Sequence, residues 1–142
     1  MKISKRFATD HALEEDGTWF DIGDGGQLKV ARKNNRRFKQ KMRELIRGKE
    51  RQLQLNTLPE EVADDILLEA MSHTILVDWK GIEDEADKPM RYSVARAKES
   101  MKAHPDFREL VEALSDDMEA FRVKQTASTE KNSVSASGSS ST

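Results

Sequence analysis

Apolar residues recur at the spacing of one helical face in four segments of the chain, which predicts four amphipathic helices. The first begins after Asn34 and Asn35, both favoured N-cap residues, and carries Phe38 and Ile46 on its apolar side. The second begins at Thr57-Leu-Pro-Glu60, which is typical of a capping box. It has the clearest apolar stripe of the four, which consists of Val62, Ile66, Leu67, Ala70, Met71 and Ile75.

The two remaining helices lie in the C-terminal half. Ser93 is a suitable N-cap for a shorter helix, and Pro105 suits the first turn of the last one. Gly81, an acidic stretch over 83–87 and Pro89 predict a loop before them. The apolar face of the last helix is predicted to consist of Phe107, Leu110, Val111, Leu114, Met118 and Phe121.

A different pattern precedes the helices. Gly17-Thr-Trp-Phe-Asp-Ile22 and Gln27-Leu-Lys-Val-Ala31 flank the turn sequence Gly23-Asp-Gly-Gly26, which predicts a β-hairpin. Ile22, Leu28 and Val30 can share one apolar face, whereas the pattern leaves open whether Trp19 or Phe20 points inward. The glycine-rich turn lacks the Lys-Ser/Thr ending of a phosphate-binding loop, so we interpret it as a plain hairpin turn.

These elements predict a mainly α, α+β fold with an N-terminal β-hairpin packed on a small bundle of about four helices. Residues 1–16 show no clear period and are interpreted as a flexible N-terminal arm. Residues 17–125 form the predicted domain. Residues 126–142 are rich in Ser and Thr and are predicted to be disordered.

Charge is distributed unevenly along the chain. The net charge is only −2, yet residues 29–51 carry a local charge of +9 and residues 60–121 one of −10. Such separation predicts a charged partner or two halves that face each other, and a homo-oligomer remains open. The sequence has no cysteine, no signal peptide and no apolar run of membrane-spanning length, so we expect an intracellular protein without a membrane partner.

The residue pattern does not predict catalysis, a cofactor or a metal site. His11, His73 and His104 are scattered, and no paired-ligand spacing occurs. The acidic stretch 83–87 lacks the ligand spacing of a calcium-binding loop. No nucleophile motif is present, and the abundant carboxylates lie on predicted helix faces. We therefore expect a binding protein and not an enzyme.

The candidate partner-binding residues are cations on the first helix, together with one tryptophan. The basic segment 33–51 could bind phosphates, although no helix-turn-helix spacing follows it, and a solvated face is the simpler interpretation. Trp79 suits a core anchor better than a partner contact. The predicted partner-binding residues are Arg36, Arg37, Lys39, Arg43, Arg47 and Trp79.

The order of these segments resembles that of the tail assembly chaperones of long-tailed bacteriophages. The resemblance covers about residues 15–125 and rests on Gly-Thr-Trp-Phe-Asp-Ile-Gly-Asp-Gly (17–25), Val-Ala-Arg-Lys-Asn-Asn (30–35) and the basic helix. Its most specific part is Val77-Asp-Trp-Lys-Gly-Ile82, with the acidic loop and Tyr92-Ser93 after it. The last helix, ending Asp117-Met-Glu-Ala-Phe-Arg122, completes the series.

This resemblance implies a non-catalytic chaperone that binds the tape measure protein and helps to recruit tail tube subunits. It also implies action in the host cytoplasm and absence from the mature virion. Many such genes produce a longer form by ribosomal frameshifting, and Glu130-Lys-Asn132 is compatible with a slippery site. Two alternatives remain: a nucleic-acid-binding regulator that uses the basic helix 33–51, and a permanent minor structural protein of the tail.

Overall fold

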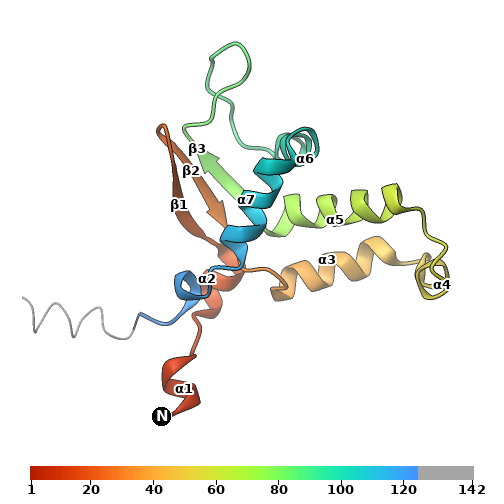
Figure 1. Cartoon of the computed structure of the whole chain (residues 1–142), viewed down its shortest axis with the longest axis horizontal. Helices are drawn as coiled ribbons and strands as arrows, with labels where there is room; N and C mark the ends of the chain where they lie inside the picture. Colours follow the sequence, from red (N-terminus) through yellow and green to blue (C-terminus); the bar gives the residue numbers. More distant parts are fainter. Residues whose placement is uncertain (125–142) are drawn as a thin grey trace, which may run out of the picture. The chain divides into compact units, whose positions relative to one another are not determined.

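The computed structural model describes residues 1–124 and contains a three-stranded sheet, seven α-helices and a short 3-10 helix (Figure 1). In chain order the elements are α1 (Ile3–Arg6), α2 (His11–Asp16), β1 (Thr18–Gly23), β2 (Gly26–Val30), α3 (Arg36–Ile46), α4 (Glu50–Gln54), α5 (Glu60–Thr74), β3 (Leu76–Lys80), α6 (Val94–Ala103), α7 (Pro105–Ser115) and the 3-10 helix η1 (Met118–Phe121).

The chain divides into two compact units. One consists of residues 1–10 with the described residues 122–124, and in it the Val123 N–H donates to the Ala8 carbonyl at 3.0 Å. The other, residues 11–121, holds the sheet and all the long helices. The predicted flexible arm, 1–16, contains α1 and α2, and its flexibility stays a prediction. The predicted disordered tail, 126–142, lies outside the described residues.

The sheet contains the predicted hairpin. β1 and β2 pair antiparallel with Thr18 opposite Val30 and Phe20 opposite Leu28, and the glycine-rich turn joins them. Leu28 and Val30 are fully buried, and Phe20 and Ile22 pack against the same core. Trp19 lies beneath the Lys80 ammonium, which is 4.2 Å from its ring centroid. Phe20 is therefore the aromatic residue of the hairpin that joins the core.

A third strand, β3, pairs antiparallel with β2, and the sequence pattern did not predict it. The apolar run after α5 reads as a continuation of the helix, but Ile75 ends that helix and the chain enters the sheet. The run is too short for its pattern to distinguish a helix from a strand. Its pairing with β2 of the hairpin therefore decides its conformation. Trp79 lies opposite Leu28 in this strand.

Four of the helices, α3, α5, α6 and α7, correspond to the four predicted ones. α5 contacts α3, α6 and β3, and α6 also contacts α7. The core lies between the sheet and α5, α6 and α7. Its buried members are Leu28, Val30, Leu68, Met71, Ile75, Leu76, Trp79, Ala97, Met101 and Val111.

Two local predictions about helix ends were wrong. Pro59 stands at the N-cap of α5 and no side chain caps this end, because Thr57 turns back toward α4, where its N–H donates to the Gln52 carbonyl at 2.8 Å. The last helix ends at Ser115, and Phe121 belongs to the separate helix η1. As a result Met118 is 49% exposed, although the continuous periodicity placed it on the apolar face.

Tyr92 connects the loop after β3 to the core. Its hydroxyl lies 2.7 Å from the Leu76 carbonyl oxygen and 3.0 Å from that of Ser72, so it donates to one of them at a time. Its ring meets that of Trp79 edge to face, with centroids 5.3 Å apart. Burial, together with the negative charge of Asp78, raises the pKa of Tyr92 to about 12.

We expect this tyrosine to make the folded state sensitive to alkali. Because its pKa is raised from 10.0 to about 12, the contribution to stability is complete below about pH 10 and is lost as the pH rises toward 12. Urea unfolding of the wild type between these pH values should show a declining free energy of unfolding. The Tyr92→Phe variant should lack this part of the decline, and an identical decline in both proteins would contradict the assignment.

Candidate partner-binding site

The segment between β2 and α3 is fixed at three points by its backbone. The Ala31 N–H donates to the Ile75 carbonyl at 2.8 Å, and the Arg32 N–H donates to the Glu14 carbonyl at 3.0 Å. The Lys33 N–H donates to the Ser115 carbonyl at 3.0 Å. These bonds place the start of α3 beside the ends of α5 and α7.

Asn35 then sets the direction of α3. Its side-chain oxygen accepts the Phe38 N–H at 2.9 Å, as an N-cap does, which confirms the predicted helix start. Its amide nitrogen donates to the Arg32 carbonyl at 2.8 Å and to the Thr74 carbonyl at 3.2 Å. One buried side chain therefore caps α3 and ties it to the last turn of α5.

Helices α3 and α5 lie side by side and extend away from the sheet, with α4 at their far end (Figure 1). α3 is strongly amphipathic, yet none of its residues is buried. The apolar residues Phe38, Met42, Leu45 and Ile46 are all half-buried. The apolar face of α3 is therefore only partly covered by α5.

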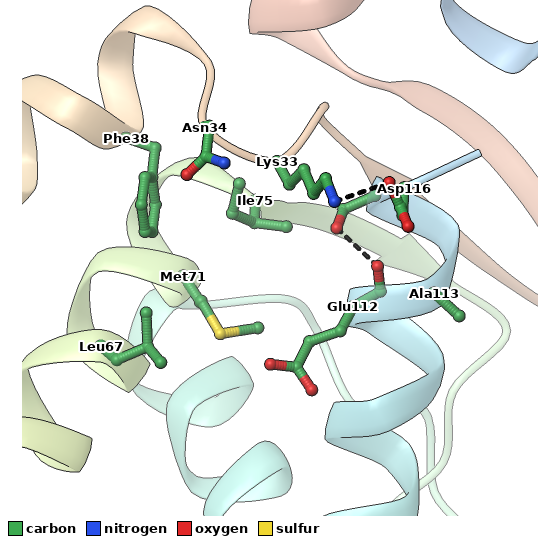
Figure 2. Close-up of a pocket in the computed structure, with 10 residues that line it drawn as sticks. Lys33, Asn34, Phe38, Leu67, Met71, Ile75, Glu112, Ala113 and Asp116 are labelled. Carbon is green, nitrogen blue, oxygen red and sulfur yellow. Dashed lines mark hydrogen bonds and ion pairs between the residues drawn. The ribbon is translucent and has the colours of Figure 1, made fainter. Parts of the chain in front are cut away.

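A groove of about 370 Å³ opens between α3 and α7, above α5 (Figure 2). Leu67, Met71 and Ile75 of the α5 segment form its floor, and the Phe38 ring stands at its side. Polar residues surround this apolar surface at the end near the sheet and along α7. They are Lys33, Asn34, Glu112, Ser115 and Asp116, with Ala113 beside them.

The charged side chains at and near the groove form ion pairs with one another. The Lys33 ammonium lies 2.8 Å from the Asp116 carboxylate and closes one end (Figure 2). The Ser115 hydroxyl donates to the Glu112 carbonyl at 2.7 Å. Arg108 of α7 pairs with Asp64 of α5 at 2.9 Å and reaches the Glu112 carboxylate at 3.9 Å. The Arg108–Asp64 pair links α7 to α5 outside the groove lining, and the Lys33–Asp116 pair lies at the groove itself.

A second ion-pair link holds α6 against α5, away from the groove. The Lys98 ammonium lies 3.0 Å from Glu69 and 3.1 Å from Asp65. The hydrogen bond from Lys98 holds the pKa of Glu69 below its usual value, and the same bond raises the pKa of Lys98. The link therefore contributes stability at neutral pH and weakens in acid, as the pH falls through the lowered pKa of Glu69.

The structure separates the predicted basic residues into two groups. Arg36 lies 3.2 Å from the Glu15 carboxylate, and Arg37 lies 3.5 Å from Glu15 and 3.2 Å from Asp16. Helix α2 ends in these acidic residues, where the helix dipole is unfavourable to negative charge, and the two arginines offset it. Arg36 and Arg37 thus bind the protein's own α2.

Lys39, Arg43 and Arg47 are exposed, and they form no ion pair with any residue of the described part, 1–124. Trp79 behaves differently, because it is only 5% exposed and its indole N–H donates to the Met90 carbonyl at 2.7 Å. Trp79 therefore belongs to the core, as the simpler interpretation of the sequence has it. The acidic loop after it, 83–87, is exposed.

Within residues 1–124, no group of three or more His, Cys, Asp or Glu side chains is arranged to hold a metal ion. In the same range no helix has the length and apolar character needed to cross a membrane. What that range does contain is a small α+β domain with a groove that has an apolar floor and with several exposed cations that form no ion pair.

The groove was not predicted, although its apolar residues were. Phe38, Leu67, Met71 and Ile75 all stood on predicted helix stripes, which sequence periodicity assigns to a core. In the structure Met71 and Ile75 are only 4% and 2% exposed, whereas Phe38 and Leu67 are half-buried and are the more accessible apolar residues of the groove. The sequence contained one indication of a groove beside the first helix. This helix has a narrow apolar stripe among many cations, so it has few side chains to bury.

A sequence model of the YdaY prophage protein family matches residues 33–132. The match spans more than half of the 142 residues, so the chain belongs to the YdaY prophage protein family. This confirms the phage origin that the resemblance implied. No curated protein and no solved structure matches the chain.

Proposed function

We propose that the protein is a phage tail assembly chaperone that binds apolar helical segments of a tape measure protein before the tail encloses them. The observation that carries the proposal is the groove between α3 and α7, with its apolar floor and charged rim. Membership of a prophage family and the order of sequence segments both support this role.

The groove suits an amphipathic helix better than a small polar ligand. Phe38 and Leu67 are half-buried and border the groove, while Met71 and Ile75 lie beneath it with 4% and 2% exposure. Helices bind such apolar grooves through apolar residues at i, i+3 or i+4, and i+7. A groove of about 370 Å³ holds only a few side chains, which favours the moderate affinity that a reversible chaperone needs.

The proposed role needs no chemistry at the groove, and we propose that the protein is not an enzyme. Around the groove, Lys33 pairs with Asp116, and Arg108 pairs with Asp64. These groups stabilise the helix packing. We also propose that the protein acts in the host cytoplasm, helps to gather tail tube subunits and is absent from the finished virion. Whether a frameshift at Glu130-Lys-Asn132 makes a longer form stays a prediction outside the described residues.

The groove can be tested with two matched substitutions in the same helix. Leu67→Gln places a polar side chain of similar size on the groove floor and should weaken binding by about tenfold, or ~1.4 kcal/mol. Val62→Gln changes another half-buried residue of α5 that does not line the groove, and its binding should stay close to wild type. Pull-down and titration against a co-expressed tape measure protein from the same prophage would measure both.

The solubility of the partner provides the second measurement. Co-expression with the wild-type chain should keep the tape measure protein soluble, and co-expression with Leu67→Gln should do so less well. If the partner is equally soluble without this protein, the chaperone proposal fails. If purified virions contain the protein at a fixed copy number, it is a permanent structural component instead.

A further inference from the structure

Four unpaired cations lie on α3, at its C-terminal end and in α4. They are Lys39, Arg43, Arg47 and Arg51, and all are exposed. Lys39 and Arg43 lie on the same helix, where like charges at this spacing repel each other, while Arg47 caps the end of α3 and Arg51 lies in the separate helix α4. None of the four forms an ion pair within the described residues, 1–124, although α3 lies directly against α5, whose first turns are acidic. We call these four residues the basic ridge.

Apolar side chains are exposed next to the basic ridge. Leu53 in α4 is 42% exposed, and Leu55, directly after α4, is 60% exposed. These two residues lie at the far end of the pair formed by α3 and α5 (Figure 1). Together with the basic ridge, these leucines give this end of the helix pair both charged and apolar groups for a partner to contact.

A negatively charged surface lies on α7. Asp106, Glu109 and Leu110 are all exposed on the face turned away from the core, and Leu110 is 37% exposed. Neither Asp106 nor Glu109 forms an ion pair within residues 1–124. We call these three residues the acidic patch. Both surfaces thus combine unpaired charge with an exposed leucine, and their signs are opposite.

We propose that the protein self-associates head to tail, with the basic ridge of one copy bound to the acidic patch of the next. Lys39, Arg43, Arg47 and Arg51 are positively charged and Asp106 and Glu109 are negatively charged, so the two surfaces are electrostatically complementary. The two surfaces are different, so the contact is heterologous, and a pair of copies retains one free basic ridge and one free acidic patch. Such contacts produce rings or open filaments.

This arrangement goes beyond the proposed function and does not depend on it. A chain of copies would, however, present its grooves repeatedly, which suits a long apolar helix. The contact is electrostatic and exposed, so salt weakens it, because the screening length falls from about 14 Å at about 0.05 M to about 4 Å at about 0.5 M.

The experiment uses the full chain, freed of nucleic acid, in sedimentation velocity at increasing concentration. The wild type should form species larger than the monomer in about 0.05 M salt and dissociate in about 0.5 M salt. The double variant Arg43→Glu/Arg47→Glu and the double variant Asp106→Lys/Glu109→Lys should each remain monomeric. An equimolar mixture of the two should associate again, because each retains the surface that the other has lost and the two reversed surfaces are complementary.

A matched control separates this contact from a general effect of net charge. Lys2→Glu/Lys5→Glu alters two exposed lysines by the same total charge, outside both surfaces, and should associate like the wild type. A wild type that stays monomeric in low salt overturns the proposal, and so does a mixture that fails to associate. Binding of an oligonucleotide by monomeric wild type, lost in Arg43→Glu/Arg47→Glu, would assign the basic ridge to nucleic acid instead.

Discussion

Replacement of Gly81 by alanine should destabilise the protein by about 3 kcal/mol or more, because the new methyl group meets backbone that cannot move aside. Gly81 directly follows β3 and has a φ of +69°, which a residue with a Cβ adopts only with strain. A Cβ at this position would collide with the carbonyl oxygen of Gly25 in the turn between β1 and β2. The substitution therefore combines backbone strain with a direct clash between two parts of the sheet.

Gly48 provides the matched control for this prediction. Its φ is +85°, similar to that of Gly81, but a Cβ there would meet nothing within 4 Å. Gly48→Ala should therefore cost only the backbone strain, about 1 kcal/mol. Urea unfolding followed by circular dichroism measures both variants. Equal losses would show that the approach of Gly25 to Gly81 does not constrain the sheet.

Replacement of Asn35 by alanine should cost about 2–3 kcal/mol and should also loosen the groove. The change removes the cap on the Phe38 N–H and the amide donor to the Arg32 and Thr74 carbonyls. Because Asn35 is 7% exposed, water replaces these bonds only if α3 moves away from α5. Partner binding through the groove should weaken together with stability.

Asn35→Asp separates the two roles of this side chain. It keeps the oxygen that caps α3 and loses the amide donor, so it should recover part of the helix but not the tie to α5. Asn34→Gly is a neighbouring control, since Asn34 is exposed with a φ of +57°, which glycine adopts freely. Hydrogen exchange should show faster opening of α3 in Asn35→Ala and little change in Asn34→Gly.

Local sequence features predicted the elements whose own residues decide their conformation. The hairpin turn needs glycine at Gly23 and Gly25, both of which have positive φ, and the alternation of Leu28 and Val30 defines its buried face. Asn35 and Ser93 cap their helices as predicted, because a cap depends on residues within one turn. Thr57 failed as a cap because its N–H and its hydroxyl both donate to the Gln52 carbonyl of α4, which turns its side chain away from the first turn of α5.

The candidate site could be predicted only in part. The sequence showed the charge separation and the cations Lys39, Arg43 and Arg47, because charge is a property of residues. It did not show that Arg36 and Arg37 pair with α2, since those partners lie more than 20 residues earlier in the chain. Trp79 stood in a run that reads as a continuation of the preceding helix, whereas its pairing with β2 makes this run a strand.

The amino-acid sequence by itself determined the helices, the hairpin, the separation of charge and the set of apolar faces, because each follows from local spacing and residue type. The tertiary structure alone decided that β3 joins the sheet, that α3 buries none of its residues fully and that a groove opens between α3 and α7. The physical reason is that periodicity marks which side chains avoid water, whereas the angles at which helices pack decide which of those side chains remain uncovered.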